Sequence, residues 1–177
     1  VDAVTPGEAS VKVGGVATAA RVQRSNNQLV VTAGPLTATL GALDRTGRVA
    51  ALDPDGNVRL NPGDPVRINV AGFKPGTSVQ VWLFSTPVLL GVAKVSDAGT
   101  VTASFTVPKD APSGSHRIAV VATTMEGKPA TLTVGVKVGS WKKESSMVVW
   151  LIVLPILLAV AGALALPATR RRRKTAG

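Results

Sequence analysis

The amino-acid sequence predicts an all-β fold class, an antiparallel β-sandwich preceded by a smaller β segment and followed by one C-terminal transmembrane helix. Three observations predict it. Apolar and polar side chains alternate along short segments, as in strands with one buried and one solvated face. Turn-forming residues separate these segments, and no helical period of 3.6 residues appears between them. A run of twenty residues without a charged side chain then lies near the end of the 177-residue chain.

These patterns divide the chain into five parts. The part before the uncharged run has about 146 residues, which suits one domain or one and a partial second. The chain begins at Val1 and shows no signal peptide, so we infer a processed protein or an excerpt from a longer chain. The predicted parts are a β-rich segment (1–60), a β-sandwich (61–139), a juxtamembrane linker (140–146), a transmembrane helix (147–166) and a basic cytoplasmic tail (167–177).

Residues 1–60 show the weaker strand pattern. Apolar and polar residues alternate over residues 16–23 and again over residues 36–40. Ser25-Asn26-Asn27 supplies turn chemistry before residues 28–33, which predicts a hairpin. A few short strands bury little surface alone. Two arrangements are therefore left open: residues 1–60 end a larger β domain, or they add strands to the sandwich that follows.

Residues 61–139 give a cleaner pattern. Val101, Ala103 and Phe105 face one way and the intervening Thr102 and Ser104 the other, as in a sheet with one buried and one wet face. Regularly spaced short strands without helices between them predict an antiparallel β-sandwich. The predicted strands cover residues 66–70, 79–84, 90–95, 101–107, 116–122 and 132–138, with turns at 74–76, 97–99, 108–114 and 126–129.

Several segments of this sandwich resemble a known family. They are Asn61-Pro62-Gly63-Asp64-Pro65-Val66, Ala71-Gly72-Phe73-Lys74-Pro75-Gly76, Val81-Trp82-Leu83-Phe84-Ser85-Thr86-Pro87-Val88-Leu89-Leu90-Gly91, Asp97-Ala98-Gly99-Thr100 and Ser113-Gly114-Ser115-His116. Together they look like the bacterial Ig-like modules of membrane-anchored surface proteins from high-GC Gram-positive bacteria. The resemblance covers about 80 residues. It implies an Ig-like β-sandwich outside the cell that acts as a spacer or stalk, and it supplies no catalytic residues.

The uncharged run over residues 147–166 predicts a membrane-spanning helix, because twenty helical residues extend over roughly 30 Å, the thickness of the hydrocarbon core. Basic residues follow the run, so the positive-inside rule places the C-terminus in the cytoplasm and residues 1–146 outside a single-pass cell membrane protein. Tryptophans near its outer end suit the headgroup region. The residues predicted to set topology or contact lipid are Trp141, Trp150, Arg170, Arg171, Arg172, Arg173 and Lys174.

Catalytic and metal-binding chemistry is poorly represented. The chain has no cysteine and a single histidine, His116, which the sequence places in a turn-rich stretch as an ordinary strand-edge residue. Asp53, Asp55 and Asn57 faintly resemble a calcium loop, but Val58 stands where such a loop needs glycine, and a hairpin turn explains them better. We therefore expect no enzyme activity, no catalytic or metal-binding residues and no cofactor.

The distribution of charge argues against a nucleic-acid partner. The net charge is +10, but seven of the twenty basic residues flank the apolar run, and residues 1–140 hold thirteen basic and nine acidic side chains. Such a weakly basic domain is not a nucleic-acid footprint. Membrane lipids are the expected partners, and the oligomeric state is unknown from sequence.

These observations predict a membrane-anchored extracellular structural or spacer module, the C-terminal end of a surface or adhesin-like protein. One alternative is a binding module that recognises a protein or an envelope glycan. Trp82 and Phe84 form its candidate interaction surface. They alternate with the apolar positions of one strand, so one of the two sets belongs to the core and the other is exposed or contacts a second sheet. A further alternative is an accessory subunit of a membrane complex.

Overall fold

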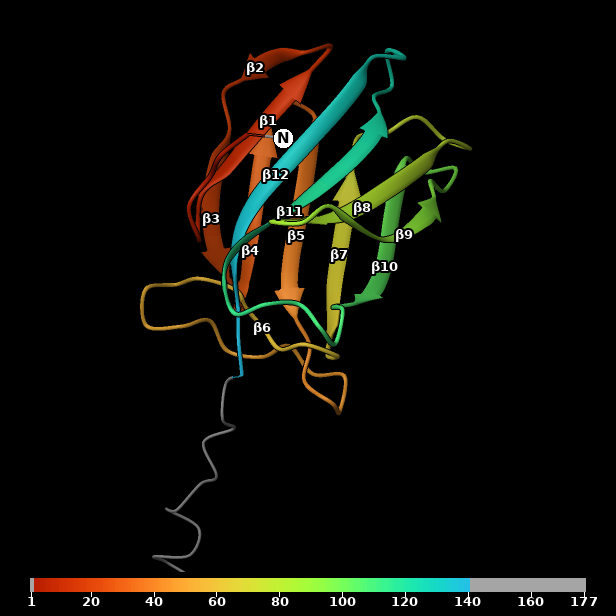
Figure 1. Cartoon of the computed structure of the whole chain (residues 1–177). Coiled ribbons are helices and arrows are strands. Elements are labelled where there is room, and N and C mark those ends of the chain that lie inside the picture. Colours follow the sequence, from red (N-terminus) through yellow and green to blue (C-terminus); the bar gives the residue numbers. More distant parts are fainter. Residues whose placement is uncertain (1, 141–177) are drawn as a thin grey trace, which may run out of the picture. The chain divides into compact units, whose positions relative to one another are not determined.

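The computed structural model describes residues 2–140, which form two β-sheets lying face to face (Figure 1). One sheet, here the β12 sheet, has the order β2-β1-β12-β11-β8-β9, with β6 also paired to β12; the other, the β7 sheet, has the order β10-β7-β5-β4-β3. The strands are β1 (Ala9–Val13), β2 (Val16–Thr18), β3 (Arg21–Ser25), β4 (Gln28–Ala33), β5 (Leu36–Ala42), β6 (Arg59–Leu60), β7 (Pro65–Ala71), β8 (Ser78–Phe84), β9 (Val88–Lys94), β10 (Thr100–Thr106), β11 (Gly114–Thr123) and β12 (Pro129–Val138).

Strand pairing confirms the prediction of an antiparallel β-sandwich. All pairs between these strands are antiparallel except the short pair of β6 with β12. The inward side chains of the two sheets meet in one hydrophobic core, to which β8 contributes Val79, Val81 and Leu83 and β7 contributes Val66 and Ile68. Burying a side chain of this size contributes roughly 1.5–3 kcal/mol, so the alternation seen in the sequence is what drives the sheets together.

The first 60 residues add strands to both sheets, which is one of the two arrangements that the sequence left open. β1 pairs with β12 over five residues from Ala9↔Val134 to Val13↔Ala130. β5 pairs with β7, for example at Leu40↔Ile68. These strands share the single core with the rest of the sandwich.

The alternation over residues 16–23 does not form one strand. It is divided between β2, in the β12 sheet, and β3, in the β7 sheet, with the exposed Ala19 and Ala20 between them. The alternating pattern continues across this crossing because both strands have the same period of two. The alternation of apolar and polar residues therefore does not show where the chain passes from one sheet to the other.

The N-terminal segment, residues 2–8, lies against the outer side of the β12 sheet. The backbone N–H of Gly7 donates to Gly135 O at 3.0 Å, and the N–H of Gly135 donates to Glu8 O at 2.9 Å. A Cβ atom at position 135 would lie 1.9 Å from Thr5 O, so only glycine lets the segment approach β12 this closely. The segment therefore covers part of one outer face of the sandwich.

Within residues 2–140, no helix is long and apolar enough to cross a bilayer. The predicted transmembrane helix, the basic tail and most of the juxtamembrane linker lie outside the described residues. So do the predicted lipid-contacting residues Trp141, Trp150 and Arg170 to Lys174.

Candidate binding face

Trp82 and Phe84 lie side by side on the outer side of the β12 sheet. In β8, Val79, Val81 and Leu83 point into the core, so Gln80, Trp82 and Phe84 point away from it. Both aromatic side chains are half-buried, with ring centroids 6.3 Å apart and ring planes inclined by 39°. The sequence could not decide which set was buried, and the structure leaves the aromatic set partly open to solvent.

Neighbouring strands surround this pair with both apolar and polar groups. On β9, Leu89 lies opposite Trp82 and Val92 opposite Gln80, with exposed fractions of 44% and 54%. On β11, Ala119 lies opposite Trp82 and Arg117 opposite Phe84. We call the surface formed by Gln80, Trp82, Phe84, Leu89, Val92 and Arg117 the aromatic face.

A β-bulge decides which side chains of β9 belong to this face. The register shifts between Val81, opposite Gly91, and Trp82, opposite Leu89, so that Leu90 has no partner of its own on β8. A bulge interrupts the regular alternation of side chains along a strand. Leu89, before the bulge, and Val92, after it, therefore both point outward, while Leu90 packs against the core.

Hydrogen bonds fix the polar members of the face. The indole N–H of Trp82 donates to Oε1 of Gln80 at 3.2 Å, so it has a partner within the protein and the amide nitrogen of Gln80 takes no part in this bond. One guanidinium nitrogen of Arg117 donates to the backbone oxygen of Asp2 at 3.2 Å. The N-terminal segment therefore borders the aromatic face at Arg117. The bond to Gln80 holds the edge of the Trp82 indole, and the side chain stays partly exposed.

The aromatic face is neutral to basic. The outward positions of β8, β9 and β11 around it carry two cations, Lys94 and Arg117, and no carboxylate. Ala119, beneath this surface, is fully buried although it lies outside the hydrophobic core between the sheets. The surface is thus closely packed at its base and apolar at its centre, with polar groups at its border.

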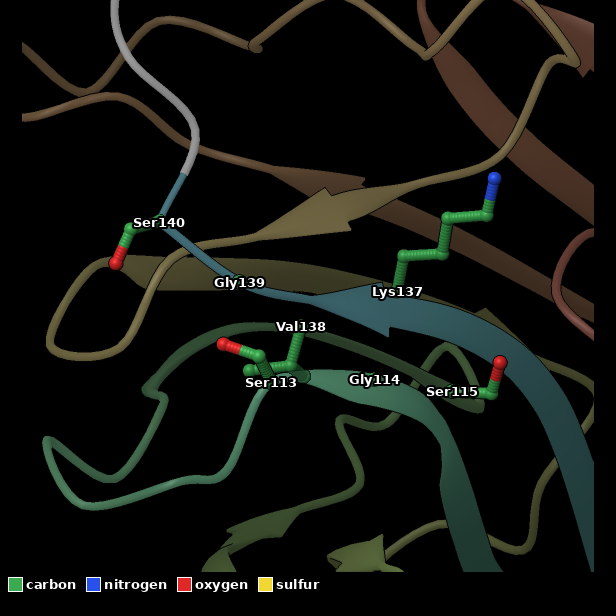
Figure 2. A pocket seen from close by; sticks show the side chains of 7 residues that line it. All are labelled: Ser113, Gly114, Ser115, Lys137, Val138, Gly139 and Ser140. Atoms are coloured by element: carbon green, nitrogen blue, oxygen red, sulfur yellow. The ribbon is translucent and has the colours of Figure 1, made fainter.

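A shallow hollow of about 390 Å³ lies elsewhere, between the start of β11 and the end of β12 (Figure 2). Three serines, Ser113, Ser115 and Ser140, contribute hydroxyl groups to its lining. Figure 2 shows Lys137 extending away from Ser113 and Val138. Its ammonium is already engaged, because it donates to Asp53 at 2.8 Å and to Asp55 at 3.3 Å. The hollow therefore offers hydroxyl groups and no free charge.

The buried Asp53 has a structural role. Its Oδ1 accepts from the backbone N–H of Asn57 at 2.7 Å, and its Oδ2 accepts from the Asn57 amide at 2.9 Å and from Lys137. Burial alone raises the pKa of Asp53, but the hydrogen bonds from Lys137 and Asn57 outweigh it and lower the pKa to about 2. The carboxylate is thus used to fix the loop over residues 53–57 against β12. Nothing in the described residues groups His, Asp and Glu as metal ligands.

His116 lies near the start of β11, which agrees with the prediction of a strand-edge residue, but it is buried. It lies opposite Val136 of β12, and the residue is 4% exposed. Its two ring nitrogens face Ser85 Oγ at 3.1 Å and Pro112 O at 2.7 Å. Because the Pro112 oxygen can only accept, Nε2 carries a proton and donates to it. The histidine therefore links the loop that contains Ser85 to the loop that contains Pro112.

The sequence identified Trp82 and Phe84 as candidates but missed the rest of the aromatic face. Leu89 and Val92 are three positions apart, so period-two reasoning puts them on opposite sides of a regular strand. Only the bulge at Leu90 brings both outward. Arg117 comes from a strand about thirty residues later in the chain, and its place beside Phe84 depends on the register of β8 with β11.

Comparison with known proteins gives one partial sequence match. No family model matches the chain. A segment of 79 residues is 33% identical to part of a "Putative endo-alpha-N-acetylgalactosaminidase" of Renibacterium salmoninarum (strain ATCC 33209). The match covers 45% of this chain, and it spans 5% of the length of that protein.

Two solved structures are distantly similar. An AA10 lytic polysaccharide monooxygenase from Streptomyces lividans has a TM-score of 0.38 and 15% identity, covering 53% of this chain and 63% of that chain. The PmoD soluble domain from Methylocystis sp. ATCC 49242 (Rockwell) has a TM-score of 0.39 and 12% identity, covering 62% of this chain and 96% of that chain. These values are too low to indicate a site or an activity.

The expectation of no enzyme activity is contradicted by the sequence match. The protein with the matching 79-residue segment is named as a glycosidase. The absence of catalytic motifs from this chain was the wrong criterion for deciding whether the protein is an enzyme. In the glycosidase the matched segment is 5% of the length, so motifs within such a segment say nothing about the chemistry of the whole protein.

Proposed function

We propose that the chain is a membrane-anchored extracellular module of a surface protein that acts on glycans. The observation that carries the proposal is the uncharged run over residues 147–166, followed after Pro167-Ala168-Thr169 by four arginines and a lysine. This pattern supports a helix that enters the membrane from outside. The resemblance to Ig-like surface modules supports the same location.

The glycan-directed part of the proposal is supported by the match to part of an endo-alpha-N-acetylgalactosaminidase. Such an enzyme acts on sugars carried by other molecules, and a module that holds it at the cell surface places it where those molecules are. The proposal concerns the protein to which this module belongs. It assigns no catalytic residue to residues 2–140.

In this proposal the sandwich acts as a rigid spacer. Its two sheets share one core, and β12 runs directly to Ser140, the last described residue. Seven steps along the chain separate Ser140 from Met147, where the predicted helix begins, and they reach at most about 25 Å.

Cysteine labelling tests this topology, since the chain has no cysteine of its own. Ser78→Cys places a thiol at an exposed position at the start of β8, and Thr175→Cys places one in the basic tail. Intact cells are treated with a membrane-impermeant maleimide, and lysed cells serve as the control. We expect labelling of position 78 alone in intact cells. Labelling of position 175, or of position 78 only after lysis, would contradict the proposed topology.

The aromatic face favours a second candidate function, a module that itself recognises a glycan or a protein. Trp82 and Phe84 are partly exposed, and Leu89 and Val92 beside them are 44% and 54% exposed. An apolar surface with a polar border is typical of recognition sites on soluble domains. A binding screen of the full chain in detergent, with Trp82→Ala as the control, tests this function. Binding that survives the substitution would place recognition elsewhere.

A further inference from the structure

We propose that the aromatic face binds a glycan through an N-acetylhexosamine residue. This inference rests on the proposed function, a surface protein that acts on glycans, and it names the ligand and the residues that would contact it. The site is formed by Trp82 and Gln80 of β8, Leu89 and Val92 of β9, and Arg117 of β11.

Trp82 provides the platform for the sugar ring. One face of a pyranose carries mainly C–H groups, which pack on the π-face of an indole ring. The indole N–H of Trp82 already donates a hydrogen bond to Gln80. The indole therefore need not rotate on ligand binding to find an acceptor for this N–H. Phe84, at 6.3 Å and inclined by 39°, is not coplanar with Trp82 and extends the apolar surface to one side. The arrangement suits one ring on Trp82 with its neighbour in the glycan directed towards Phe84.

Leu89 and Val92 distinguish an acetylated sugar from a simple hexose. They are among the most exposed large apolar side chains of the described residues, and the bulge in β9 directs both to the side of Trp82. A plain hexose has no apolar substituent for them to cover, whereas the acetamido group carries a methyl group. Burial of one methyl group corresponds to roughly a fourfold gain in affinity.

Polar groups at the border suit the remainder of the ligand. The amide nitrogen of Gln80 is not used in its bond to Trp82, and only one guanidinium nitrogen of Arg117 bonds to Asp2 O. Both can donate to the acetamido oxygen or to ring hydroxyls. The outward positions of β8, β9 and β11 contain no carboxylate, so a neutral or acidic glycan meets no repulsion there, and a basic protein partner would find no counter-charge.

The test measures sugar binding by the full chain in detergent micelles, using saturation-transfer NMR with N-acetylgalactosamine, N-acetylglucosamine and galactose as probes. We expect both acetylated sugars to bind, at least about fourfold more tightly than galactose. Trp82→Ala should abolish binding of all three sugars. Leu89→Ser should remove the preference for acetylated sugars and keep the weak binding of galactose. Val16→Ser is the matched control, because Val16 is 70% exposed on β2 at the opposite edge of the same sheet.

Three outcomes would overturn the inference. They are equal affinity for galactose and the acetylated sugars, binding that Trp82→Ala leaves unchanged, and no binding of any sugar by a chain whose circular dichroism shows folded β-structure. A dimer in sedimentation that Trp82→Ala dissociates would assign the face to a second copy instead. The topology test does not depend on any of these results. If the sugar site were disproved, labelling of Ser78→Cys on intact cells would still support the proposed surface module.

Discussion

The two outer faces of the sandwich differ in composition although they belong to the same fold. The β7 sheet presents mainly hydroxyl and amide side chains, such as Thr39, Asn69 and Thr102, which lie in one row across three strands. The β12 sheet presents the aromatic face, and its other half is overlaid by residues 2–8. A face that only contacts solvent needs polar side chains, as on the β7 sheet, and no exposed aromatic or large apolar groups. The β12 sheet is therefore the side on which large apolar side chains and the contacts of the N-terminal segment are concentrated.

The largest expected difference in stability is between two glycine substitutions, one on each outer face. Gly135→Ala places a methyl group 1.9 Å from the backbone oxygen of Thr5, which only displacement of the N-terminal segment can relieve. We expect a loss of about 3 kcal/mol in the free energy of unfolding, from overpacking and from the two backbone hydrogen bonds of Gly135. Urea unfolding followed by circular dichroism measures it.

Gly41→Ala is the control on the β7 sheet. A Cβ atom there meets only the side chain of Gln28, at 2.9 Å, which can rotate away. We expect a cost below about 1 kcal/mol. Equal costs for the two substitutions would contradict the view that the N-terminal segment is a packed part of the β12 face.

The second effect concerns the ionic contact at the end of the β12 sheet. Lys137→Met leaves the carboxylate of Asp53, which is 8% exposed, without its ammonium partner. We expect a loss of about 2 kcal/mol, below the value for a fully buried pair because the Lys137 side chain is 31% exposed. Asp55→Asn removes the more exposed partner of Lys137, and we expect it to change stability by less than about 0.5 kcal/mol.

The same pair gives a pH dependence of known sign. The pKa of Asp53 is about 2 in the folded protein against an ordinary value of 3.8, so the folded state favours the ionised form. Its contribution is complete above pH 4 or so and is lost as the pH falls towards about 2. In acid titrations of unfolding, Asp53→Asn should flatten the stability profile between these limits. An unchanged slope would contradict the role of this carboxylate.

The third effect compares the central residues of the two faces. Trp82→Ala removes a half-buried indole from β8, and we expect a cost of about 1–2 kcal/mol. Thr39→Ala on β5 removes a half-buried hydroxyl and methyl from the polar face, and we expect about 0.5 kcal/mol or less. Thermal unfolding of both variants checks the difference. Matching costs would mean that the indole makes little contact with its own sheet and serves binding alone.

The alternation of residues in the sequence predicted which side chains of a strand face the core and which face outward. Val79, Val81 and Leu83 are buried because they alternate, and the same alternation made Trp82 and Phe84 candidates. It could not detect what depends on register or on contacts distant in sequence. The bulge at Leu90, the overlay of Gly135 by Thr5 and the burial of His116 between two loops leave no periodic signal.

Asn69 carries the smallest predicted effect, and it tests whether the β7 face is more than a solvated surface. Its Oδ1 atom is buried and has no hydrogen-bond partner among the described residues, although Thr39 and Thr102 flank it on both neighbouring strands. A buried acceptor without a partner is unfavourable, and threonine suits a strand better than asparagine. Asn69→Thr should therefore stabilise the fold by about 0.5–1 kcal/mol in urea unfolding. If the substitution destabilised the protein instead, the amide would have a structural role on this face, and the contrast between the two outer faces would be smaller than their composition indicates.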